Sequence, residues 1–129
     1  MCRIGVLILM CFLCLSEVFA QKGMKEVKEY DYDFSKVIPV KYLSLHHIFD
    51  STGLLLEEIE YLSNGMTARH RKCAYDSTGT MLYEVFLDGQ KKPYRTIRYI
   101  YSNGLKTQRL TFNKDSVLID KKEFEYIKY

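Results

Sequence analysis

From residue 40 onward, short stretches rich in Tyr, Ile, Val, Leu, Phe and Thr alternate with turn-forming residues. Within several stretches apolar and polar positions alternate, as where Phe124 and Tyr126 alternate with glutamates. A period of two is typical of a β-strand, and stretches of this length are too short for average helices. The pattern predicts strands at 40–48, 54–61, 66–75, 80–87, 94–101, 105–112 and 117–127.

The segments between these strands carry the residues of tight turns. Phe49–Gly53 reads Phe-Asp-Ser-Thr-Gly and recurs as Tyr-Asp-Ser-Thr-Gly at Tyr75–Gly79. Asp-Ser-Thr-Gly suits a type I turn in which the aspartate caps the turn and the fourth residue, a glycine, takes a positive φ. The dipeptides Asn64-Gly65, Asp88-Gly89 and Asn103-Gly104 are typical of tight hairpin turns.

The turns repeat with a fixed period. Aromatic residues start the turn motif at positions 49, 75 and 101, which are 26 residues apart each time. Three two-strand units therefore occupy about 49–74, 75–100 and 101–126, after a lead-in strand. The sequence predicts an all-β domain over 40–129, an antiparallel meander of about seven strands. Because an open meander leaves two unpaired edges, we expect edge-strand homodimerisation to be accessible to it.

The aromatic-Asp-x-x-Gly turns at 49–53 and 75–79 resemble the YD repeats of Rhs-type proteins. The Asn-Gly turns at 64–65 and 103–104, each a few residues after an aromatic, are similar to MORN-like repeats of the YwqK antitoxin type. This resemblance covers about residues 42–126. It implies a β-sheet that is built by repetition and serves as a scaffold or binding surface, and it transfers no functional residue.

The first 39 residues differ from the repeats. Residues 1–20 have a basic Arg3, an apolar stretch over 4–15, and small residues at Val18 and Ala20, which is the layout of a secretory signal peptide cleaved after Ala20. The alternatives are an uncleaved anchor and, less favoured because Leu13 precedes it, a lipid anchor on Cys14. Residues 21–39 are a charged lead-in, either an extended arm or an added strand.

Export changes what the cysteines imply. Cleavage would remove Cys2, Cys11 and Cys14 and leave Cys73, so no intramolecular disulfide could form in the mature chain. The expected location is periplasmic or extracellular, with no transmembrane span after cleavage. Stability in that oxidising compartment must then come from packing and hydrogen bonds rather than from disulfides.

Length and composition exclude several classes of protein. A chain of 129 residues is one domain, and 47% hydrophobic residues is too apolar for disorder. A net charge of +3 does not indicate nucleic-acid binding, and none is expected for an exported protein.

No catalytic, metal or cofactor site is predicted. The adjacent His46 and His47 point to opposite faces of a strand, so at most one could join His70 at a metal. Glu58 and Glu60 share a face and could form an acid pair, as a hydrolase would require, but a solvated stripe is the favoured interpretation. There is no Gly-x-Ser-x-Gly elbow and no phosphate-binding glycine loop.

Basic residues gather in the middle of the chain. Residues 66–109 contain nine basic and three acidic residues, interleaved with tyrosines. Such a face suits an anionic glycan or an envelope component, bound through charge and stacking. The alternative is an antitoxin or immunity-type inhibitor acting by protein–protein contact. The candidate binding residues are Arg69, Arg71, Tyr94, Arg95, Arg98, Tyr99 and Arg109, and reversing the charges of Arg95 and Arg98 is expected to abolish salt-sensitive binding.

Overall fold

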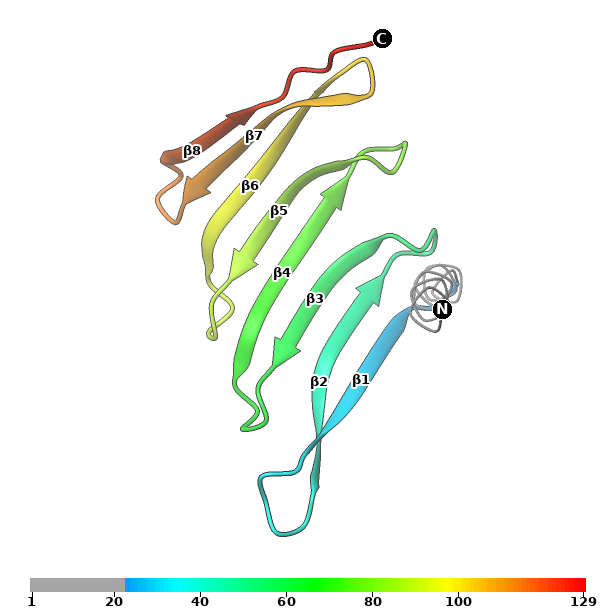
Figure 1. Ribbon diagram of the computed structural model, residues 1–129, viewed down its shortest axis with the longest axis vertical. Coiled ribbons are helices and arrows are strands. Elements are labelled where there is room, and N and C mark those ends of the chain that lie inside the picture. Colours follow the sequence, from blue (N-terminus) through cyan, green and yellow to red (C-terminus); the bar gives the residue numbers. More distant parts are fainter. Residues whose placement is uncertain (1–22) are drawn as a thin grey trace, which may run out of the picture.

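The computed structural model describes residues 23–129 as eight β-strands in one sheet (Figure 1). The signal peptide predicted at residues 1–20 lies outside the described residues. The strands are β1 (Glu26–Asp33), β2 (Val40–Phe49), β3 (Leu55–Tyr61), β4 (Thr67–Tyr75), β5 (Met81–Leu87), β6 (Pro93–Ser102), β7 (Leu105–Asn113) and β8 (Leu118–Glu123).

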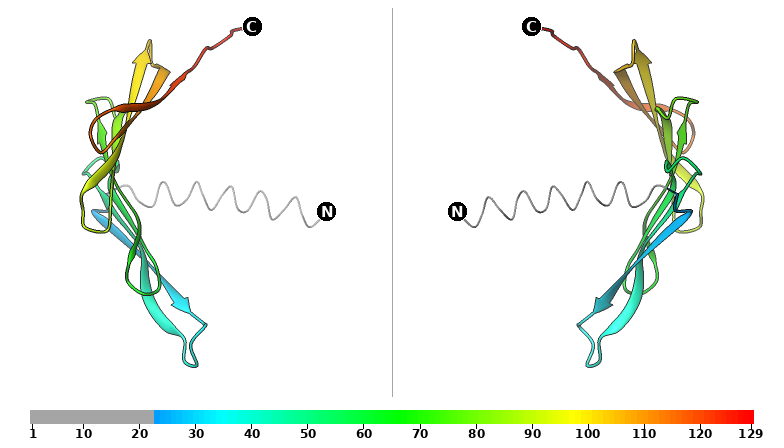
Figure 2. Two further views of the ribbon diagram at one scale, coloured as in Figure 1. Left: turned by 90° about the vertical axis from the view of Figure 1, so that its left-hand side faces the viewer. Right: turned by 90° about the vertical axis from the view of Figure 1, so that its right-hand side faces the viewer.

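Each strand pairs with its neighbours in the chain, so the spatial order equals the sequence order from β1 to β8 and every pair is antiparallel. Viewed from the side, the sheet is a single bent layer (Figure 2). The predicted antiparallel meander is confirmed. The lead-in segment supplies an additional strand, β1, so the sheet has eight strands rather than about seven, and β8 ends at Glu123 rather than near 127. Among residues 23–129, no helix is long and apolar enough to cross a membrane.

Aspartate-capped turns set the length of the connections. The Asp50 backbone N–H donates to the Leu54 carbonyl, and its Oδ1 accepts from the N–H groups of Thr52 and Leu54. Gly53 has φ of 91°, as predicted for the fourth turn residue. The same arrangement is centred on Asp76, with Gly79 at φ 84°. The side-chain cap fixes a five-residue turn, which displaces the pairing by one residue where the strand resumes.

The dipeptide interpretation is right for one turn and wrong for two. Asn103 and Gly104 both have positive φ, 52° and 75°, which is the two-residue type I′ geometry. The turn at Asp88 is instead a five-residue turn capped by Asp88, and its left-handed residue is Lys91 rather than Gly89. The turn from 62 to 66 is likewise five residues long. Counting dipeptides misses the extra residues that an Asx cap recruits.

Two turns place a residue with a side chain where others have glycine. Lys91 and Ser116 both have φ of 61°. Left-handed backbone disfavours residues with a Cβ. Lys91→Gly and Ser116→Gly are each expected to raise the free energy of unfolding by about 0.5–1 kcal/mol, measured by urea denaturation. The reverse change, Gly65→Ala, should destabilise, since φ is 84° there and the added Cβ would meet nothing within 4 Å. Destabilisation by the glycine variants would contradict this account.

A tyrosine at the end of each two-strand unit binds the start of that unit. The acceptor carbonyl lies 20 residues earlier in the chain each time, and each distance is 2.8 Å: Tyr75 donates to Leu55, Tyr101 to Met81 and Tyr126 to Lys106. The first aromatic of the series is Phe49, which has no hydroxyl. The 26-residue aromatic period therefore reflects a recurring hydrogen bond between consecutive strands' ends.

Removing one of these hydroxyls is expected to cost a single hydrogen bond. Tyr101→Phe should lower the free energy of unfolding by about 1 kcal/mol, because the part-buried Met81 carbonyl loses its donor. Tyr126→Phe is the matched control, since that ring is exposed and water can replace the hydroxyl. Equal losses in the two variants, measured by urea denaturation, would contradict the assignment.

The core of this single-layer sheet is made by side chains that cover one another on the same face. No described side chain is fully buried. Those that come closest are equally divided between apolar and polar types: Phe49, Cys73, Phe86 and Leu87, and Glu58, His70, Glu84 and Thr111. Buried polar groups are costly unless they find partners, so their hydrogen bonds decide how this sheet is held together.

Candidate binding face

One row of side chains crosses six strands. From β2 to β7 it consists of His47, Glu58, Arg71, Phe86, Arg95 and Asn113. Directly opposed residues of antiparallel strands project from the same face, and so do residues two apart along a strand. The face that carries this row is called the polar face. It also bears Glu60, Arg69, Cys73, Glu84, Ile97, Tyr99, Arg109 and Thr111.

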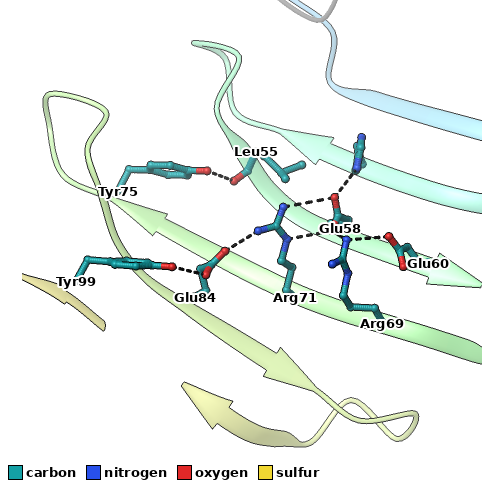
Figure 3. Close-up of polar contacts among 9 residues, drawn as sticks. Leu55, Glu58, Glu60, Arg69, Arg71, Tyr75, Glu84 and Tyr99 are labelled. Carbon is teal, nitrogen blue, oxygen red and sulfur yellow. Dashed lines mark hydrogen bonds and ion pairs between the residues drawn. The ribbon is translucent and has the colours of Figure 1, made fainter. Parts of the chain in front are cut away.

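Glu58 is the centre of the polar face on β3 (Figure 3). Its Oε1 accepts from Arg69 Nη2 at 2.8 Å and from Arg71 Nε at 3.0 Å, and its Oε2 lies 2.8 Å from His47 Nε2. Arg69 also donates to Glu60 Oε1 at 2.7 Å. Burial by itself would raise the pKa of Glu58, but the bonds from Arg71 and His47 and the nearby arginine charges outweigh it and hold that pKa below its usual value.

The network continues from Arg71 to β6. Arg71 Nη1 donates to Glu84 Oε1, and the hydroxyl of Tyr99 donates to Glu84 Oε2 at 2.8 Å (Figure 3). Burial, followed by the hydrogen bond to Glu84 and the charge of that carboxylate, raises the pKa of Tyr99 to about 12. Glu58 and Glu84 are thus both buried carboxylates that share Arg71.

This geometry argues against a catalytic acid pair at Glu58 and Glu60. Glu58 is buried rather than part of a solvated stripe, and its lowered pKa keeps it ionised at neutral pH. A general acid at neutral pH needs a carboxyl whose pKa is raised. Arg69 bridges the two carboxylates as a structural ion pair.

The histidines do not converge. His46 lies 3.2 Å from Glu26, and His70 lies 2.6 Å from Glu57, so each has a carboxylate of its own. His46 and His70 share a row but are separated by Ile59. Over residues 23–129, no three His, Cys, Asp or Glu side chains are grouped closely enough to hold a metal ion.

The structure divides the seven candidate binding residues. Arg69 and Arg71 are neutralised by glutamates. Arg98 lies on the opposite face, because it is paired with Tyr83 and Leu110 between two polar-face positions of β6.

The remaining four candidates lie on or beside the polar face. Arg95, Tyr99 and Arg109 occupy it, and Tyr94 is the extra residue of a bulge, its ring centroid 5.9 Å from the Arg95 guanidinium carbon.

A continuous stretch of chain around β6 and β7 is purely cationic. Residues 89–114 contain no acidic residue, and we call them the cationic hairpin. Its basic residues are Lys91, Lys92, Arg95, Arg98, Lys106, Arg109 and Lys114. The sequence already holds this pattern, but counting charge over 66–109 merged it with the arginines that glutamates neutralise.

The polar-face arginines of the cationic hairpin are weakly partnered. The Arg95 guanidinium lies 4.3 Å from the centroid of the Phe86 ring, and Arg109 Nη2 reaches Asp120 only at 3.8 Å. The Nε atoms of Arg95 and Arg109 are buried and make no hydrogen bond within the described sheet. Lys106 Nζ stands 4.3 Å above the Tyr99 ring.

The two arginines are too far apart along the sheet to act as a clamp on one small ion. Tyr99 pairs with Arg109, and Tyr99 is four positions from Arg95, which corresponds to about 13 Å along a strand. Ile97 and Thr111 fill the space between them. The hairpin therefore presents separated positive charges with an apolar and aromatic surface between them.

Comparisons with known proteins add little. No protein-family model matches the chain, and no curated protein matches it. Among solved structures, it is similar to one described as the crystal structure of TarM, with 12% sequence identity and a TM-score of 0.36. The similarity covers 82% of this chain, and the chain spans 23% of the length of the TarM chain. Similarity at this level carries no argument about function.

Proposed function

We propose that this is an exported, non-enzymatic β-repeat binding protein that holds an anionic glycan or other polyanionic envelope component on the cationic hairpin. The observation that supports this most is the partnering of the arginines. Glutamates neutralise Arg69 and Arg71, whereas Arg95 has no carboxylate partner among the described residues and Arg109 meets one only at 3.8 Å.

An extended polymer fits this surface better than a small anion. Charges about 13 Å apart match a ligand that carries its negative charges at intervals. The exposed Tyr94, beside Arg95, offers a ring on which a sugar can stack. The turn pattern of residues 1–20 and the resemblance to YD and MORN-like repeats agree with an exported scaffold of this kind, and they belong to the proposal.

The test measures binding of the purified full chain to heparin, a sulfated glycan, and to polygalacturonate, a carboxylated one, with dextran as the uncharged control. We expect salt-sensitive binding to one or both polyanions. Arg95→Gln and Arg109→Gln should each weaken it about tenfold, since a charge-assisted hydrogen bond contributes about 1.5 kcal/mol.

Arg98→Gln is the matched control, because it removes the same charge from the opposite face. It should weaken binding much less than either polar-face variant. Equal losses in all three variants would show that net charge alone governs binding, and absence of binding to both polyanions would contradict the proposed function.

The alternative is an immunity-type inhibitor that acts by protein–protein contact. The unpaired outer edges of β1 and β8 favour it, since an extended segment of a target can add to a sheet edge. Recovery of one protein at stoichiometric amounts with the full chain, with no retention on the polyanions, would favour the inhibitor.

A further inference from the structure

Both ends of the sheet are open within residues 23–129. Each of β1 and β8 pairs with one neighbour, so each has an outer edge whose backbone groups are unpaired. Because the meander has an even number of strands, β1 and β8 run in opposite directions. A second copy could therefore place its β1 beside β8 and continue the same antiparallel alternation across the junction.

Hydrogen bonds identify which residues of β8 face outward. The Phe124 N–H donates to the Thr107 carbonyl, so Phe124 directs its backbone groups toward β7. In an antiparallel ladder the direction alternates from residue to residue. Lys122 consequently faces β7, whereas Lys121 and Glu123 direct their N–H and C=O groups to the outer edge.

The same argument applies to β1. The Phe49 N–H donates to the Lys25 carbonyl, so Lys25 faces β2. By alternation Val27 and Glu29 also face β2, and Lys28 and Tyr30 direct their backbone groups outward. Outward residues of one edge must pair with outward residues of the other.

One register satisfies this condition and matches the side chains. It pairs four consecutive residues of β1 with four of the neighbouring copy: Val27 with Phe124, Lys28 with Glu123, Glu29 with Lys122, and Tyr30 with Lys121. Two of these pairs are ion pairs of opposite polarity, one is apolar, and one places an ammonium beside an aromatic ring. In this register the polar face continues from one copy to the next, because Glu29 and Lys122 both lie on it.

We infer that copies of this chain assemble head to tail, with β8 of one copy paired to β1 of the next. Such a heterologous interface leaves an open edge at each end and so extends to a chain or closes to a ring.

Symmetric pairing of two β8 strands is disfavoured by charge. With outward residues matched, a two-fold axis places one residue opposite its own copy. In the centre of β8 that residue is Asp120, Lys121, Lys122 or Glu123, so like charges meet in every case. The edge thus rejects its own copy and accepts the β1 sequence.

Cross-linking tests the register. Glu29 and Lys122 would form a non-hydrogen-bonded pair with Cα atoms about 4.5 Å apart, within the range of a disulfide. Full chains carrying Glu29→Cys or Lys122→Cys are oxidised separately and mixed, with the wild-type chain giving the background from its own cysteines. We expect a disulfide-linked species of twice the chain mass from the mixture and not from either variant alone. Asp120→Cys, two positions away on the same face, is the control that should cross-link poorly with Glu29→Cys.

Charge reversal tests the assembly without a covalent bond. Sedimentation velocity should show concentration-dependent growth of the wild-type chain. Glu29→Lys and Lys122→Glu should each abolish it, because each brings like charges together, and an equimolar mixture should restore it, because every junction between unlike variants has opposite charges. A wild type that stays monomeric, cross-linking of Lys122→Cys with itself, or no restoration on mixing would overturn the inference. These outcomes do not depend on polyanion binding.

Discussion

Glu58→Gln is expected to lower the free energy of unfolding by about 3 kcal/mol, the cost of breaking a buried ion pair without creating a cavity. The Glu58 side chain is 8% exposed and accepts from two arginines. An amide keeps the shape but removes the charge, so Arg71 would retain only Glu84 as an ionic partner. Urea denaturation at neutral pH measures the difference.

Glu60→Gln is the matched control. Its side chain is 40% exposed and meets only Arg69 in the described network, so the change should cost less than about 1 kcal/mol. If the two variants lost equal stability, the buried position of Glu58 would not matter and the network would be a surface feature.

The pH dependence of the Glu58 effect has a definite sign. The pKa of Glu58 in the folded protein is below its ordinary value of 4.5. The stability it contributes is therefore present above pH 4.5 and is lost as the pH falls through the lower, folded-state pKa. The gap between the wild type and Glu58→Gln should narrow as the solution is acidified below that value. A gap that stays constant would show that the charge of Glu58 is not what stabilises the sheet.

Phe86→Ala is expected to lower the free energy of unfolding by about 3 kcal/mol and to weaken polyanion binding as well. Phe86 is 7% exposed, and its ring lies between the arginines of the opposed positions on β4 and β6. Truncation removes buried apolar surface in the centre of a single-layer sheet that has no second layer to close the gap. It also removes the ring on which the Arg95 guanidinium rests.

Two controls separate these effects. Phe86→Leu keeps apolar cover but not the aromatic ring, so it should retain most of the stability and lose part of the binding. Tyr83→Ala removes a ring that is 40% exposed from the other face, and it should change stability less. If Phe86→Ala left stability unchanged, the ring would not be part of the core.

The sequence by itself determined the local structure of this protein. Asp50 and Asp76, each three residues before a glycine, specify turns through contacts that lie within five residues, so the boundaries of β2 through β7 follow closely from the pattern. The aromatic period of 26 residues likewise located the repeating unit, although the hydrogen bond from Tyr75 or Tyr101 that explains it spans 20 residues and was not predictable from the spacing.

What only the tertiary structure decided is the pairing across strands. The five-residue turns and their bulges shift the register by one residue each time, and a shift of one residue moves a side chain to the opposite face. Sequence could therefore group Arg95 and Arg98 as one basic patch, whereas the register places them on opposite faces. It also gave no sign that Arg71 is held by Glu58 and Glu84 while Arg95 is not, because a residue's ionic partner depends on which strand lies beside it and in which register.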